Sequence, residues 1–123
     1  MRVSISDYKK NGTDRKVKVE ISKDDTFSLD VTLAHIIKPA LEEFKKQIKG
    51  YPESIIEEYF SGRMKSDKLD QLCTEKWKEI IQTMIDAFEL IISDDYYHHD
   101  EITSQKITKG LDNFSRYYNN LWW

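Results

Sequence analysis

The chain has 123 residues, of which 39% are hydrophobic and 33% charged, and its net charge at pH 7 is −3. This length and composition exclude a disordered chain and fit one globular domain with its own core. The first ten residues contain no continuous apolar segment, and no apolar run approaches the ~20 residues of a membrane span. We therefore expect a soluble protein that is neither exported nor membrane-bound. The single cysteine, Cys73, excludes an internal disulfide and fits a reducing compartment.

Two segments near the start, residues 2–8 and 16–22, alternate between apolar and polar side chains. The apolar positions are Val3, Ile5, Val17, Val19 and Ile21. Asn11-Gly12 lies between the segments, where a hairpin turn needs positive φ. A β-hairpin is predicted. Because a two-stranded hairpin is marginally stable alone, we expect its Val/Ile face to pack on the helices that follow.

The first predicted helix begins near Asp30, which can cap it, and ends before Gly50. Its apolar residues recur at helical spacing: Leu33, Ile37, Ala40, Leu41, Phe44 and Ile48. Pro39 lies inside this pattern, where it removes a backbone donor and clashes with the carbonyl of His35. A kink or a break near His35 is expected.

Three further helices are predicted. A short one follows Tyr51-Pro52, and a long central one over residues 69–91 keeps three-four spacing for more than five turns. Residues 93–101 form a polar, acidic loop. A last helix starts near Thr103, with Gly110 allowing close approach to a neighbour. Its predicted apolar stripe is Ile107, Leu111, Phe114, Tyr118 and Leu121.

The expected fold class is therefore α+β, with an N-terminal β-hairpin packed on a small bundle of three long helices and one short helix. We expect a single domain over residues 1–123, with the hairpin at 2–22 and the helical bundle at 30–123. Basic residues in the chain are interrupted by acidic ones, which disfavours a nucleic-acid polymer as a partner.

The string DTFSLDVTLAHIIKP, residues 25–39, followed by Gly50-Tyr51-Pro52, resembles the opening of a widespread family of small tailed-phage proteins. That family has the pattern DTW-S-x-D-x-TLA-x-II-x-P. The likeness continues at Trp77, at residues 84–89 and in the aromatic ending, and it covers about two-thirds of the chain. The resemblance implies a phage origin and a location in the cytoplasm of the infected bacterial host. The family has no established enzymatic activity that the resemblance could transfer to this chain.

This chain departs from the family pattern at three places. Phe27 replaces the usual tryptophan, and Gln82-Thr83 replace positions that are usually acidic. A long acidic-aromatic insertion of larger members is reduced here to Ser93–Glu101. If the insertion or the acidic positions hold a ligand, this chain binds differently.

Polar and aromatic residues suggest a ligand site. Asp30, Thr32 and His35 lie outside the apolar stripe of the first helix, and aromatic rings could stack on a nucleotide base. The predicted ligand-binding residues are Asp30, Thr32, His35, Trp77, Glu89, Tyr117 and Tyr118. The alternative interpretation is a capped polar helix face and an aromatic core.

The last two residues, Trp122 and Trp123, cannot both face one core from adjacent positions. At least one is predicted to pack on a second copy in a two-fold dimer. The donors Asp94, Asp95, His98, His99, Asp100 and Glu101 could attract a metal ion, but they lack ligand spacing. We expect no metal and no cofactor.

Three functions remain open. The first is a non-catalytic phage accessory protein that counteracts host defence by binding a small nucleotide-type signal or a defence protein. The second is a small nucleotide-processing enzyme that uses Asp30, His35 and Glu89. The third is an interaction module without a ligand. No catalytic residue is assigned.

Overall fold

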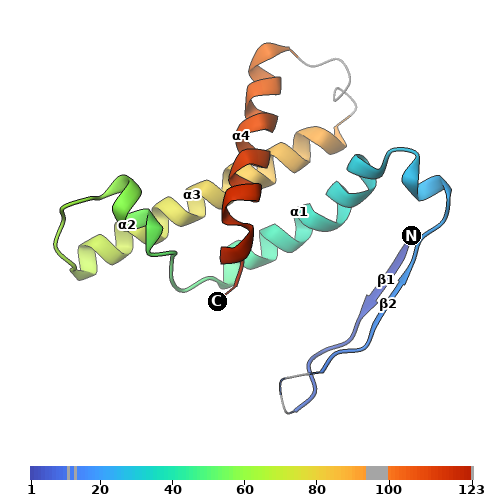
Figure 1. Cartoon of the computed structure of the whole chain (residues 1–123), viewed down its shortest axis with the longest axis horizontal. Helices are drawn as coiled ribbons and strands as arrows, with labels where there is room; N and C mark the ends of the chain where they lie inside the picture. Colours follow the sequence, from blue (N-terminus) through green and yellow to red (C-terminus); the bar gives the residue numbers. More distant parts are fainter. Residues whose placement is uncertain (11, 13, 94–99, 123) are drawn as a thin grey trace. The chain divides into compact units, whose positions relative to one another are not determined.

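The computed structural model describes residues 1–10, 12, 14–93 and 100–122. It contains a two-stranded antiparallel hairpin and four α-helices, three of them long (Figure 1), which confirms the α+β class. The chain divides into two compact units, Met1–Thr32 and Leu33–Trp123. The predictions of a single domain and of a hairpin packed on the helices stay predictions. Among the described residues, no helix is long and apolar enough to cross a membrane.

The N-terminal unit is built on the hairpin of β1 (Arg2–Ile5) and β2 (Val17–Glu20). Val3 pairs with Val19 and Ile5 with Val17, so these side chains share one face of the ribbon. Gly12 has the positive φ, 74°, that the sequence predicts for the turn. Asn11 lies outside the described residues.

A short 3-10 helix, η1 (Asp24–Thr26), follows the hairpin. The carboxylate of Asp25 accepts hydrogen bonds from the amino group of Met1 at 3.0 Å and from the backbone N–H of Ser22 at 2.8 Å. These two contacts lower the pKa of Asp25. They tie the start of β1 to the segment that leaves β2.

The helix α1 (Leu29–Gln47) runs through Pro39 without interruption, so the predicted break near His35 is wrong. Proline removes one backbone hydrogen bond. Buried residues lie on both sides of it, Ala34 before and Leu41 after. Their packing holds the two halves of α1 in one helix.

The helix α3 (Asp67–Ile92) is the most buried element of the helical unit, as its periodicity predicts, and ten of its residues are buried. The side chain of Ser66 caps it by accepting a hydrogen bond from the backbone N–H of Leu69. The short α2 (Ser54–Tyr59) contributes the fully buried Ile55.

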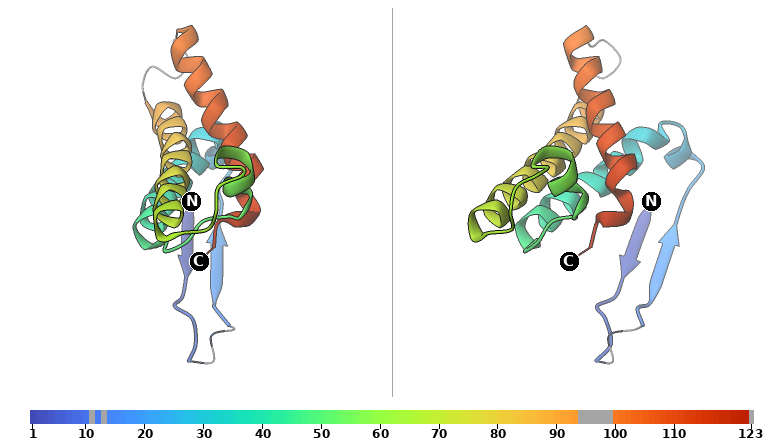
Figure 2. Two further views of the ribbon diagram at one scale, coloured as in Figure 1. Left: turned by 90° about the vertical axis from the view of Figure 1, so that its left-hand side faces the viewer. Right: turned by 60° about the vertical axis from the view of Figure 1, so that its left-hand side comes forward.

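Helices α1 and α3 lie side by side and run in opposite directions (Figure 2). The amino group of Lys45 donates a hydrogen bond to Gln82 Oε1 at 2.7 Å. The ring of Phe44 meets that of Trp77 edge to face, with centroids 6.4 Å apart. Side chains therefore join the two helices through both polar and aromatic contacts.

The helix α4 (Glu101–Tyr117) crosses α3 and continues into η3 (Tyr118–Asn120). Its buried residues are Ile107, Gly110 and Tyr117. The predicted stripe is therefore wrong at Leu111 and Tyr118, which are 37% and 62% exposed. The physical reason is Gly110, which brings the backbone of α4 against α3, so positions one residue later turn away by about 100°.

Candidate binding surfaces

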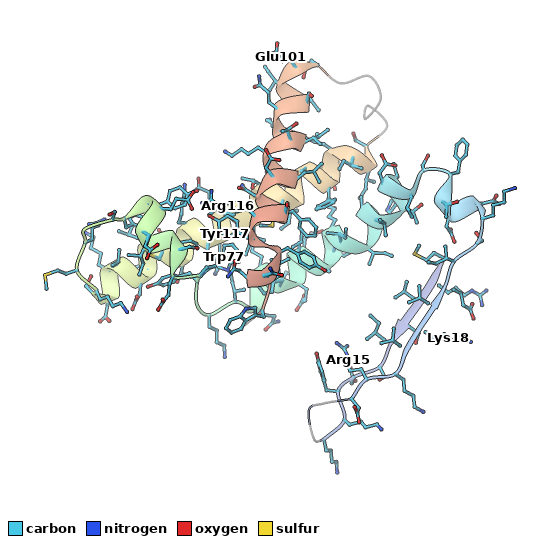
Figure 3. All side chains as sticks on the ribbon, in the orientation of Figure 1. Arg15, Lys18, Trp77, Glu101, Arg116 and Tyr117 are labelled. Carbon is cyan, nitrogen blue, oxygen red and sulfur yellow. The ribbon has the colours of Figure 1, made fainter. Side chains whose placement is uncertain are left out.

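The two rings at the centre of the predicted stacking site belong to the core. Trp77 on α3 is 1% exposed and Tyr117 on α4 is 2% exposed. Their ring centroids lie 5.3 Å apart in an edge-to-face arrangement, where α4 crosses α3 (Figure 3). Both rings are packed against other side chains, and neither has an exposed face on which a ligand could stack.

The hydroxyl of Tyr117 donates a hydrogen bond to Glu58 Oε2 at 2.9 Å. The other oxygen of this carboxylate pairs with Arg116 Nη1 at 2.6 Å. Burial raises the pKa of Tyr117, and the hydrogen bond to Glu58 raises it further. This cluster joins α4 to α2, and the shifted pKa follows from structural burial.

The raised pKa of Tyr117 predicts a loss of stability at alkaline pH. Above the ordinary tyrosine pKa of about 10, the unfolded chain releases this proton while the folded chain keeps it. Stability is therefore full below pH 10 and falls as the pH rises toward the folded-state value. The free energy of unfolding in urea is measured at pH 8 and at pH 10.5. Between these two pH values it should fall less for Tyr117→Phe than for the native chain. Equal losses would contradict the assignment.

The predicted polar residues Asp30, Thr32 and His35 lie on the first turns of α1. The carboxylate of Asp30 accepts a hydrogen bond from the backbone N–H of Val31 at 2.9 Å. The hydroxyl of Thr32 donates to the carbonyl of Asp25 at 3.1 Å. These bonds act as local caps of the helix start. The side chain of His35 is exposed.

Glu89, the third residue of the predicted enzyme site, forms an ion pair with Lys38 at 2.6 Å. This pair links α3 to α1. The hydrogen bond to Glu89 raises the pKa of Lys38. The carboxylate of Glu89 therefore has a structural partner of opposite charge.

Tyr118, the third aromatic residue among the predicted ligand-binding residues, is 62% exposed. At the predicted interface, Trp122 is 74% exposed, while Trp123 lies outside the described residues. The same holds for Asp94, Asp95, His98 and His99. No group of three or more metal-ligating side chains is found within the described ranges 1–10, 12, 14–93 and 100–122.

The first binding surface that the structure presents is the aliphatic face of the hairpin, formed by Val3, Ile5, Val17 and Val19. These four side chains are between 43% and 62% exposed. Within the described part of the chain the sheet has two strands, so each strand also has one edge without a paired strand. Alternation in the sequence predicts this face, and the expectation that it packs on the helices stays a prediction.

The hairpin is also basic. Residues 1–22 contain six basic and three acidic side chains, a net charge of +3, and because the whole chain carries −3, the remaining residues carry −6. Arg15 and Lys18 mark the basic character of the ribbon in Figure 3. Positive charge and exposed aliphatic surface thus occur together on the hairpin segment 1–22.

The second surface is an apolar groove of about 350 Å³ in the helical unit. The groove is lined by residues of α1, by one residue of α4 and by the residue that follows η3. They are Ile36, Ile37, Ala40, Leu41, Phe44, Phe114 and Leu121. All seven are apolar. The sequence does not predict this α1–α4 groove, because its existence depends on how α4 is rotated at Gly110.

No family model, curated protein or solved structure matches the chain. The resemblance to tailed-phage proteins therefore stays a prediction from sequence motifs.

Proposed function

We propose that this chain is a non-catalytic binding protein that engages an acidic protein through its hairpin. In the setting that the phage resemblance implies, the partner is a host defence protein whose action the phage counteracts. The observation that carries the proposal is the half-exposed aliphatic face of Val3, Ile5, Val17 and Val19 on a hairpin segment, residues 1–22, of charge +3.

Two properties of the hairpin favour a protein partner. Exposed aliphatic side chains gain ~25 cal/mol for each Å² that a partner covers, and an open strand edge offers backbone hydrogen bonds to an added strand. The basic residues favour an acidic surface and repel a basic one, which gives specificity. A nucleotide needs open rings for stacking, and Trp77 and Tyr117 are packed in the core.

The test begins with the capture of proteins from infected cells on the immobilised chain, followed by purification of the captured protein and titration calorimetry. Replacing Ile5 and Val17 together by threonine removes aliphatic surface and keeps a residue suited to strands. We expect this double variant to weaken binding roughly ten-fold or more. Lys16→Glu with Lys18→Glu should slow association and reduce its dependence on salt.

Asp30→Ala and His35→Ala are the matched controls, because both side chains are exposed and lie outside the hairpin. They should bind as the native chain does. The plating efficiency of the phage on a host that carries the defence protein should fall with the hairpin variants and stay unchanged with the two controls. Unchanged binding by the Ile5/Val17 variant would contradict the proposal, and so would a lower melting temperature of its helices, which would place the hairpin face inside the fold.

A ligand screen tests the alternative function, the sequestration of a nucleotide. A ligand at 100 times its Kd stabilises the folded state by ~2.7 kcal/mol. A thermal shift of that size with a cyclic nucleotide or an ADP-ribose derivative, lost in Tyr118→Ala, would replace the protein-binding proposal. Recovery of a cleaved nucleotide would favour the enzyme that uses Asp30, His35 and Glu89.

A further inference from the structure

The α1–α4 groove lies beside an exposed aromatic side chain of the same unit. Leu121 lines the groove, and the next residue, Trp122, is 74% exposed. Tyr118, 62% exposed, stands one turn earlier with its ring against that of Phe114, at a centroid distance of 5.5 Å. A hollow and a projecting ring therefore occur next to each other.

This combination fits a two-fold pair of identical chains. In such a pair each copy presents the same surface, and a feature of one copy contacts its complement on the other. A projecting indole can then enter the partner's groove, while the partner's indole enters the first. A foreign protein would have to supply both shapes, whereas a second copy already has them.

The absence of charged side chains from the lining of the groove also favours a second copy as its occupant. Every side chain that lines the groove is apolar, so two copies of a chain with net charge −3 can meet there without placing like charges face to face. The hairpin differs, because its charge of +3 would repel a second hairpin. Of the two exposed surfaces, the groove is the one suited to self-association.

The area buried between two copies determines how tightly they are expected to associate. An aromatic side chain buries about 150–250 Å², and each copy offers Tyr118 and Trp122. Together with the groove walls that they cover, two copies bury roughly 1,000 Å², the lower end for a specific interface. Reversible association that depends on protein concentration follows.

We propose that the α1–α4 groove binds Trp122 of a second copy of this chain, in a reciprocal two-fold dimer. Sedimentation velocity over a range of concentrations should show a shift from the monomer mass of 14.7 kDa to twice that value. The Trp122→Ala variant should stay monomeric at every concentration. Ala40→Glu places a charge in the groove at an exposed helical position and should have the same effect.

Met64→Ala is the matched control, since Met64 is 88% exposed and does not line the groove. It should dimerise as the native chain does. Circular dichroism of each variant checks that the helices are intact, and Trp122→Ala alone decides the outcome if Ala40→Glu does not fold. A native chain that is monomeric throughout, or a Trp122→Ala variant that still dimerises, would overturn the proposal.

Cross-linking separates docking in the groove from contact between the two indoles. A mixture of the Trp122→Cys and Ala40→Cys variants, one carrying a mass tag, should form a disulfide-linked heterodimer under mild oxidation. The native Cys73 is fully buried. Cross-linking of the Trp122→Cys variant with itself, as fast as in the mixture, would place the two indoles face to face and overturn the groove assignment.

Discussion

Replacing Trp77 with alanine is expected to lower the free energy of unfolding by about 3–5 kcal/mol. The ring is 1% exposed and makes edge-to-face contacts with Phe44 of α1 and Tyr117 of α4. Its removal leaves a cavity where three helices meet. A domain of this size is stable by only about 5–15 kcal/mol, so the loss is a large share of the total.

Urea unfolding followed by circular dichroism at 222 nm measures this effect without relying on tryptophan fluorescence. Trp122→Ala provides the matched control, because the same truncation at a 74% exposed position should change stability by no more than ~0.5 kcal/mol. Both variants are compared at a concentration where the chain is monomeric. A cost below 1 kcal/mol for Trp77→Ala would mean that α3 is not the centre of the core.

Gly110→Ala should destabilise the chain by about 2–3 kcal/mol, although alanine is the better helix former by ~1 kcal/mol. A Cβ atom at Gly110 would lie 2.3 Å from Ala87 Cβ and 2.3 Å from the carbonyl oxygen of Thr83. The carbonyl belongs to the backbone of α3 and cannot turn away. The two helices would have to separate, which would also strain the hydrogen bond from Asn113 Nδ2 to Thr83 Oγ1, at 2.8 Å.

Thermal unfolding should show the Gly110→Ala effect as a fall in Tm of roughly 10 °C. At Gly50, an added Cβ meets nothing within 4 Å, so Gly50→Ala is the control and should leave Tm within about 2 °C of the native value. A Gly110→Ala variant as stable as the native chain would show that α3 and α4 are not in backbone contact.

The helices could be predicted from the sequence because the spacing of apolar residues follows the face that each helix buries. The spacing from Leu69 to Ile91 has one good solution, a long buried helix. The rotation of α4 could not be predicted in the same way. Leu111 and Tyr118 satisfy the three-four spacing as well as Tyr117 does, and only the contact at Gly110 decides which set faces α3.

A single sequence does not separate ligand-site residues from core residues and helix caps. An aromatic residue at helical spacing is equally suited to a core and to a stacking platform, and Trp77 and Tyr117 belong to the core. Caps such as Asp30 resemble ligand contacts because both use carboxylate oxygens. The exposed groove and hairpin face depend on what is left uncovered after packing, which a single sequence does not report.

The backbone contact at Gly110 has a consequence for the variation that this fold allows. Helix α4 packs on α3 at their crossing, and its buried residues begin at Ile107. The length of the connection after Ser93 therefore has little effect on the stability of the α3–α4 contact. Each doubling of such a connection costs only about 0.6 kcal/mol in closure entropy. Additional residues at this position are therefore expected to cost the helical unit little free energy of unfolding.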